Sequence, residues 1–139
     1  MPIFRDSNQF YKNVGELMDR AKMDPKVGPK IAKSKIVIQF RYTEPDAMTT
    51  VNAKDKPTQE NAYVDVIQGD CDLNADVSMS MKADVAHQFW LGKINLVSAL
   101  AKGEIKATGP IPKILKLLPA VKPLYDEYPK ILRENGMEI

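Results

Sequence analysis

Residues 77–118 read VSMSMKADVAHQFWLGKINLVSALAKGEIKATGPIPKILKLL, and the hydrophobic period changes several times along them. The stretch opens with alternating apolar and polar residues, which is typical of a half-buried β-strand. Two short runs with helical spacing follow, each ended by a glycine suited to a helix terminus, Gly92 and Gly103. Alternation returns at residues 104–108, before an aliphatic run. The stretch therefore predicts strand, helix, helix, strand and helix, in that order.

The aliphatic run that begins at Ile111 is predicted to be an interrupted amphipathic helix. On a helical wheel its apolar side chains span an arc of about 160°, and they are Ile111, Ile114, Leu115, Leu117, Leu118 and Val121. Pro112 suits a first helical turn, Pro119 interrupts the hydrogen-bond ladder, and Pro123 blocks a second run. Two interpretations of this arc stay open, namely a core helix or the wall of an apolar pocket.

The rest of the chain predicts two further helices and three further strands. Residues 7–23 carry apolar residues at three- and four-residue steps, with Asp6 or Ser7 as the cap, and Asp84 is expected to cap the helix that follows it. A final helix is expected from Pro123 to Glu134. The strands suggest an antiparallel meander, at residues 35–42, 47–53, 63–67 and 77–82. The predicted fold class is α+β, a mostly antiparallel five-stranded sheet covered by helices.

Composition narrows the classes of protein to which the chain can belong. With 139 residues, one domain over residues 1–139 is expected. The 20 Lys and Arg residues are scattered among 18 Asp and Glu residues, so no nucleic-acid partner is expected. One cysteine and one histidine leave no disulfide and no Cys/His zinc site. Neither a signal peptide nor a run of about 20 apolar residues is evident, which favours a cytoplasmic protein.

The sequence contains no evident catalytic set. His87 lies in a short predicted helix, and Cys71 lies between acidic residues, which reduces the reactivity of a thiol. No glycine-rich phosphate-binding motif occurs. The paired acids are expected to be solvated, at Asp70 and Asp72 and at Asp126 and Glu127. We therefore expect neither an enzyme nor a bound cofactor or metal.

The run from Val77 to Leu118 resembles the sterol carrier protein family, in particular its type-two sterol-binding domain. The family pattern combines an alternating strand, an acid that opens a short helix, a Gly-Lys pair, a small residue in the next helix, a glycine with an apolar-Lys-x-x-Gly strand, and an aliphatic helix. These features are found at Val77–Met81, Asp84, Gly92, Lys93, Ala99, Gly103, Ile105, Lys106, Gly109 and Ile111–Leu118. The sequence departs from the pattern at Glu104, Pro110 and Pro112.

The resemblance implies an apolar cavity between sheet and helices that holds a fatty acid, a fatty acyl-CoA, a sterol or a similar lipid. The side chains expected to contact this ligand are Phe40, Met79, Met81, Phe89, Trp90, Ile94, Leu96, Leu100, Ile105, Ile111, Ile114, Leu115 and Leu118. An acidic head group has candidate partners in Lys93, Lys106 and Lys113. The expected function is that of a non-catalytic lipid carrier.

Two other classes of function stay open at this stage. Related domains in ubiquinone-biosynthesis accessory proteins suggest a module that presents lipid substrates to partner enzymes. An enzyme acting on a hydrophobic substrate is the third possibility, and it requires a catalytic role for His87 or Cys71. A transient membrane contact and a homodimer formed through exposed apolar residues also stay open.

Overall fold

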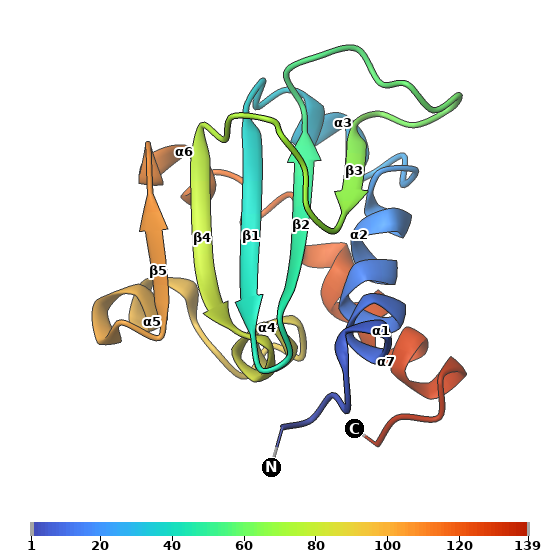
Figure 1. Cartoon of the computed structure of the whole chain (residues 1–139). Helices are drawn as coiled ribbons and strands as arrows, with labels where there is room; N and C mark the ends of the chain where they lie inside the picture. The colour runs from blue at the N-terminus through green and yellow to red at the C-terminus, as the bar shows by residue number, and fades with distance from the viewer. Residues whose placement is uncertain (1, 139) are drawn as a thin grey trace.

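The computed structural model describes residues 2–138 and contains one five-stranded sheet with helices on one face (Figure 1). The sheet order is β3-β2-β1-β4-β5. The strands are β1 Val37–Thr43, β2 Ala47–Asn52, β3 Asp65–Gln68, β4 Val77–Lys82 and β5 Ile105–Thr108. The predicted fold class is thereby confirmed, because three of the four strand pairs are antiparallel.

The predicted meander is correct for β1, β2 and β3 but wrong for β4, which lies beside β1 and parallel to it. Residues 69–76 can span about 26 Å when extended, enough to return the chain along the sheet. At the start of this segment the Gly69 N–H donates to the Met48 carbonyl, and at its end the Asp76 N–H donates to the Val37 carbonyl. The segment therefore delivers β4 to the end of the sheet where β1 begins.

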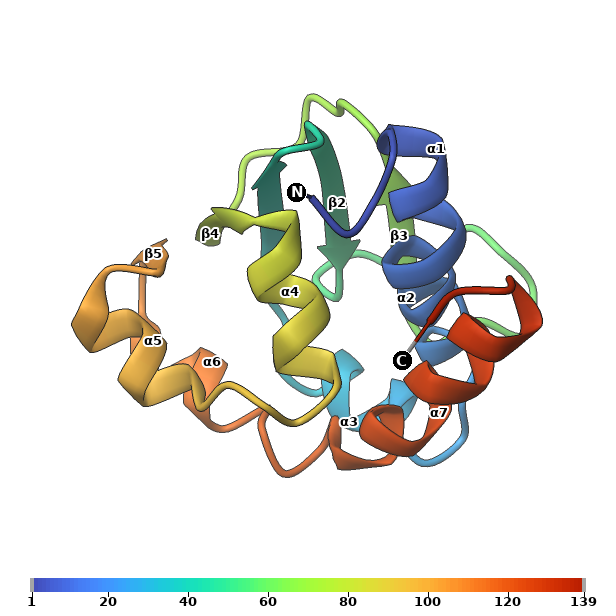
Figure 2. The same ribbon diagram turned by 90° about the horizontal axis from the view of Figure 1, so that it is seen from below.

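The amino-terminal helical segment packs against the carboxyl-terminal helix (Figure 2). The segment is continuous through α1 Ser7–Phe10, the π-helical turn η1 Tyr11–Gly15 and α2 Glu16–Ala21. Its predicted cap is confirmed, because the Asp6 side chain accepts from the Gln9 N–H. The last helix, α7, spans Lys122–Glu134. Apolar side chains of both segments are fully buried, so this pair forms the main part of the core.

Three short helices cover the other half of the sheet, α4 Ala83–Trp90, α5 Leu96–Lys102 and α6 Ile111–Leu115. The predicted glycine ends are confirmed, since Gly92 and Gly103 both adopt φ of 78°. Asp84 is not the cap that the sequence suggested, because α4 begins one residue before it. Its carboxylate instead accepts from the Ile3 N–H at 2.9 Å and so ties the amino terminus to α4.

The aliphatic run is interrupted as predicted. After α6 ends at Leu115, residues 116–121 form turns in which the Leu117 and Leu118 N–H groups donate to carbonyls only three residues earlier. Pro123 does not block the next run as expected, since it lies in the first turn of α7, where its missing N–H is tolerated. One helix, α3 Gly28–Ala32, was not predicted. Within residues 2–138, no helix is both long and apolar enough to cross a bilayer.

Candidate functional site

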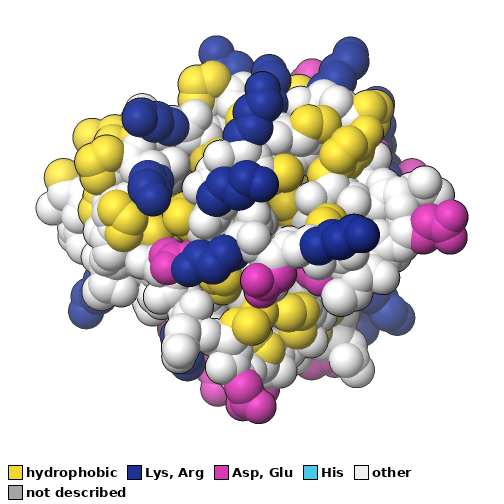
Figure 3. Space-filling view, turned by 90° about the horizontal axis from the view of Figure 1, so that it is seen from above, with side chains coloured by type: hydrophobic (Ala, Val, Ile, Leu, Met, Phe, Trp, Pro, Cys, Tyr) yellow, Lys and Arg dark blue, Asp and Glu magenta, His cyan; other side chains and the backbone are white. Residues whose placement is uncertain are grey.

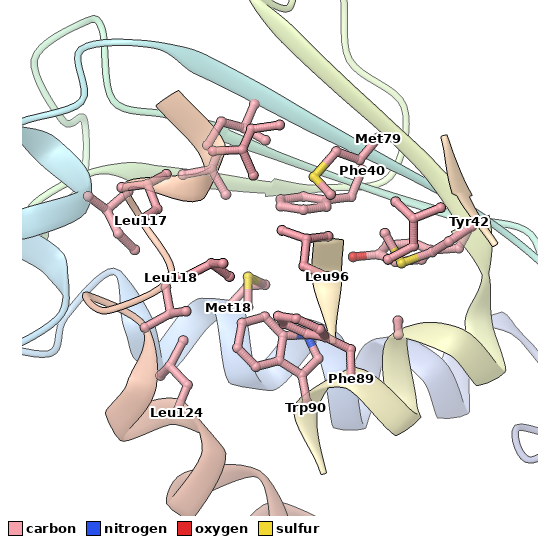
Figure 4. A pocket seen from close by; sticks show the side chains of 18 residues that line it. Met18, Phe40, Tyr42, Met79, Phe89, Trp90, Leu96, Leu117, Leu118 and Leu124 are labelled. Atoms are coloured by element: carbon pink, nitrogen blue, oxygen red, sulfur yellow. The ribbon is translucent and has the colours of Figure 1, made fainter. Parts of the chain in front are cut away.

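An apolar cavity of about 100 Å³ lies between the sheet and the helical layer (Figure 4). Its wall is built from side chains of β1, β2, β4 and β5 on one side and of the helices and the 116–121 segment on the other. The period of two along β1 directs Ile38, Phe40 and Tyr42 to this side of the sheet. The cavity is thus a product of the alternating strands and of the helices that cover them.

The cavity lies where two hydrophobic clusters meet. The first cluster joins the amino-terminal helices, α4 and α7, and the second joins β4 and β5 to α5 and α6. Phe40, Met81 and Phe89 pack against both clusters and are only partly buried. The side chains at the junction therefore leave space between them instead of closing into a single core.

Most of the predicted ligand-contacting residues line this cavity. They are Phe40, Met79, Met81, Phe89, Trp90, Leu96, Ile105, Ile114 and Leu118. The other four predicted residues are outside the lining and pack against the second cluster, namely Ile94, Leu100, Ile111 and Leu115. Ile111, Ile114 and Leu115 all belong to α6, yet only Ile114 lines the cavity, so the whole predicted arc does not describe the wall.

Sequence reasoning missed half of the lining. Four missed residues belonged to a recognised pattern: Ile38 and Tyr42 share a strand face with Phe40, and Leu117 and Val121 lie on the aliphatic arc. The remaining five come from distant elements, namely Met18, Ile31, Val51, Ala86 and Leu124. No local signal separates these five from ordinary core residues, because only the packing of the layers brings them to the cavity.

The lining offers almost no polar chemistry. Its side chains are aliphatic, aromatic or thioether groups, and the only hydrogen-bonding groups among them are the Tyr42 hydroxyl and the Trp90 indole N–H. Burial raises the pKa of the Tyr42 phenol, and proximity to Tyr11 adds to the increase, so Tyr42 stays neutral. The cavity can therefore bind apolar groups, but its lining contains no charged side chain that could pair with an ion.

The residues considered for catalysis are placed away from this lining. His87 is buried and shares a hydrogen bond with Tyr128, with 2.6 Å between Nδ1 and the hydroxyl oxygen. The Cys71 thiol donates to the Thr50 hydroxyl at 3.2 Å, where residues 69–76 cross β2. Neither side chain contributes to the cavity wall. Between residues 2 and 138, no cluster of His, Cys, Asp or Glu could hold a metal ion.

Three of the four paired acids are exposed, as expected, and the fourth forms an ion pair. Asp70, Asp72 and Asp126 are exposed, whereas Glu127 accepts from the Arg20 guanidinium at 2.7 Å. Arg20 also pairs with Glu16 and Glu134. Glu127 therefore helps to join α2 to α7.

Exposed lysines gather at one end of the sheet, which we call the lysine-rich end (Figure 3). Strand pairing places the start of β1, the end of β2, the start of β4 and the end of β5 together there. The lysines before or after these strand ends are Lys30, Lys33, Lys35, Lys54, Lys56, Lys113 and Lys116. Hydrogen bonds from Lys54 and from the Val37 N–H, with Lys113 nearby, lower the pKa of Asp76. None of the three lysines predicted for a head group, Lys93, Lys106 and Lys113, lines the cavity.

Comparison with known proteins gives one family and several similar structures. A model of the SCP-2 sterol transfer family matches residues 15–122. Sterol Carrier Protein 2 from Yarrowia lipolytica, in its apo form, is 19% identical with a TM-score of 0.62, over 92% of this chain and 98% of that one. A comparison with curated proteins gave no match.

Two further structures share the fold. Palmitated SCP2L2 from Aedes aegypti is 19% identical with a TM-score of 0.54, over 79% of this chain and 95% of that chain. The UbiJ-SCP2 ubiquinone synthesis protein is 17% identical with a TM-score of 0.54, over 79% of this chain and 85% of that chain. At these identities the likeness concerns the fold alone.

Proposed function

Because the chain belongs to the SCP-2 sterol transfer family, we propose that it is a non-catalytic carrier that holds one lipid in the cavity between sheet and helices. The observation that carries this proposal is the uncharged, almost wholly apolar lining. Each methylene group moved from water into such a lining contributes about 0.8 kcal/mol. A chain of a dozen carbons therefore gains affinity from burial alone, without a dedicated head-group site.

The cavity enlarges to accept such a ligand. Its volume is about 100 Å³, whereas ligand pockets occupy roughly 300–1,000 Å³. The part of the wall best suited to move outward is the segment from Ile114 to Val121, where Leu117, Leu118 and Val121 line the cavity but remain half-buried. Its interrupted backbone hydrogen bonds let it shift without disrupting a regular helix.

The proposed ligands are a fatty acid, a fatty acyl-CoA, a sterol or a similar apolar lipid. The palmitated Aedes protein supports an acyl chain as the cargo of this fold. An acidic head group would stay at the surface near Lys113, because the lining holds no cation. The cytoplasmic location and the action of residues 1–139 as one domain remain predictions.

The lysine-rich end is the proposed place of contact with an anionic membrane surface. Each lysine near such a surface contributes roughly 1 kcal/mol of attraction. We expect Lys113→Glu to weaken binding to vesicles that contain phosphatidylserine, measured by flotation. Lys102→Glu is the matched control, because Lys102 is also exposed but precedes β5 at the opposite end of the sheet. Equal losses in both variants would contradict a defined contact face.

An accessory role is the second candidate function, and the fold shared with the UbiJ-SCP2 ubiquinone synthesis protein favours it. In that role the domain presents lipid substrates to partner enzymes. Two results together would favour the accessory role over the carrier function. A stable enzyme partner would copurify with the protein, and the protein would show no measurable affinity for lipid.

The carrier proposal is tested by titrating lipid-stripped, folded protein with a fluorescent fatty acid and then displacing it with unlabelled fatty acids, acyl-CoAs and sterols. We expect saturable binding of one ligand per chain. Leu118→Glu places a charge in the apolar lining and should weaken binding at least tenfold. Val97→Glu is the matched control, because Val97 is 57% exposed and outside the lining.

Two outcomes would overturn the carrier proposal. One is the absence of binding to the folded wild-type protein, which would favour the accessory role. The other is equal affinity in wild-type protein and in folded Leu118→Glu, which would place the ligand elsewhere on the molecule.

A further inference from the structure

The Tyr42 hydroxyl differs from most polar groups of the interior. Every fully enclosed side-chain nitrogen or oxygen between residues 2 and 138 has a hydrogen-bond partner. Tyr42 is only 5% exposed, yet its hydroxyl has no partner among these residues, and it points into the cavity (Figure 4). The equally buried Tyr128 instead satisfies its hydroxyl with His87. The cavity thus contains an unused hydrogen-bonding group, and the Trp90 indole N–H is the only other such group in its lining.

The position of this hydroxyl is fixed by the aromatic rings around it. The Phe10 ring lies 4.5 Å from the Tyr42 ring, centroid to centroid, and the Phe40 ring lies stacked at 6.3 Å. The Tyr42 backbone is also held in the centre of the sheet, between β2 and β4. The ring therefore stays in place when the hydroxyl is removed.

The chemistry of the wall limits the ligand group that this hydroxyl can receive. A neutral phenol both donates and accepts a hydrogen bond, so it fits a hydroxyl or a carbonyl oxygen. An ionised carboxylate at the same depth would lack a cationic partner, since no lining residue is charged. A pure hydrocarbon would fill the space but leave the phenol desolvated and unpaired.

We propose that the Tyr42 hydroxyl anchors a neutral oxygen at the buried end of the lipid, so that the cavity selects lipids with a hydroxyl or carbonyl group over hydrocarbons of the same length. This inference rests on the proposed carrier function and adds the ligand class. The favoured ligands are long-chain alcohols, sterols and other lipids with an uncharged polar end. An ionised acid binds in the reverse direction, with its carboxylate outside the cavity.

The test uses Trp90, the only tryptophan of the chain, which lines the cavity and reports on a bound bromine atom by fluorescence quenching. Bromododecanol and bromododecane form the matched pair of probes, because they differ only in the hydroxyl. We expect wild-type protein to bind the alcohol about tenfold more tightly than the alkane, as one net hydrogen bond allows. Tyr42→Phe should abolish this preference. It should weaken the binding of the alcohol and leave the affinity for the alkane equal or higher.

Tyr128→Phe is the control, because it removes a buried hydroxyl that is not part of the lining. It should lower stability but leave the preference for the alcohol unchanged. Loss of the preference in both variants, or its survival in Tyr42→Phe, would overturn the inference while leaving the carrier function intact. Failure of wild-type protein to bind either probe would overturn the carrier function itself.

Discussion

The helix pair α2–α7 and the segment from Ile111 to Val121 are both rich in aliphatic residues and prolines, yet they pack differently. In the helix pair, Leu17, Ile131 and Leu132 have no exposed surface. In the segment, only Ile114 is buried to a comparable degree among the cavity-lining residues, and Leu117 and Leu118 remain half-buried. Aliphatic content therefore does not distinguish the packed helix pair from this segment of the cavity wall, whereas the partial exposure of Leu117 and Leu118 does.

Polar interactions reinforce the same contrast. Arg20 of α2 donates to Glu127 and Glu134 of α7, and His87 of α4 shares a hydrogen bond with Tyr128 of α7. These interactions fix α7 from two sides. The corresponding hydrogen bonds of the 116–121 segment are local, between backbone groups three or four residues apart. Side-chain interactions thus fix α2, α4 and α7, which we call the fixed half, whereas the 116–121 segment is the part of the wall that we propose moves for a ligand.

The largest expected effect is on the stability of the fixed half. Leu132→Ala leaves a cavity at a fully buried position and should lower the free energy of unfolding by about 2–5 kcal/mol. Leu117→Ala, at a half-buried position in the cavity wall, should cost about 1 kcal/mol or less. Urea denaturation of the two variants measures both values. Equal losses would show that the two regions are packed alike.

The second-largest effect is expected from ligand binding, which should stabilise the protein and protect the cavity wall from hydrogen exchange. At a free ligand concentration 100 times the Kd, the free energy of unfolding should rise by about 2.7 kcal/mol. At short exchange times, before global unfolding contributes, hydrogen exchange should locate the added protection in residues 114–121 and leave the amides of α7 between Tyr128 and Leu132 nearly unchanged. An equal gain in protection in both regions would contradict a local opening of the wall.

The burial of His87 should make the free energy of unfolding sensitive to acid. Burial lowers the pKa of His87, with Asp84 opposing and Lys93 adding to the change. In the unfolded chain a histidine binds its proton below about pH 6.5, whereas folded His87 resists protonation. Acidification through this range therefore favours unfolding, with a slope of at most about 1.4 kcal/mol per pH unit.

The measurement is the free energy of unfolding between pH 7 and pH 5 in wild-type protein and in His87→Gln. The variant should lose the slope attributable to one proton in this range. Asp6 and Asp76, whose pKa values are lowered by hydrogen bonds, titrate at more acidic pH and do not contribute here. An unchanged slope in the variant would assign the acid sensitivity to other groups.

The smallest expected effect concerns the ion pairs of Arg20. Its side chain is 33% exposed, so solvent screens the three carboxylates, and Arg20→Gln should cost about 1 kcal/mol. The loss should shrink in high salt. Arg20→Lys, the charge-conserving control, should recover only part of the stability because a lysine cannot present several donors in a fixed plane. A loss independent of salt would point to packing of the arginine stem instead.

Much of the fold follows from local patterns. The four positions of the last helix that were spaced to pack inward, Leu124, Tyr128, Ile131 and Leu132, are all buried. The strand, helix, helix, strand order of residues 77–108 also matches, because alternation and glycine ends are local properties of the chain. Nine of the side chains expected from the family resemblance line the cavity.

The sequence by itself determined most of the secondary structure, the family and the apolar character of the wall, since each depends on residues close together in the chain. Only the tertiary structure decided that β4 pairs with β1, because that pairing depends on where the 69–76 connection returns. It also decided which apolar residues face the cavity and that Tyr42 lacks a partner there. A cavity forms where the side chains of two packed layers do not fill the space between them. Because these layers are built from elements that are distant in sequence, no local pattern predicts it.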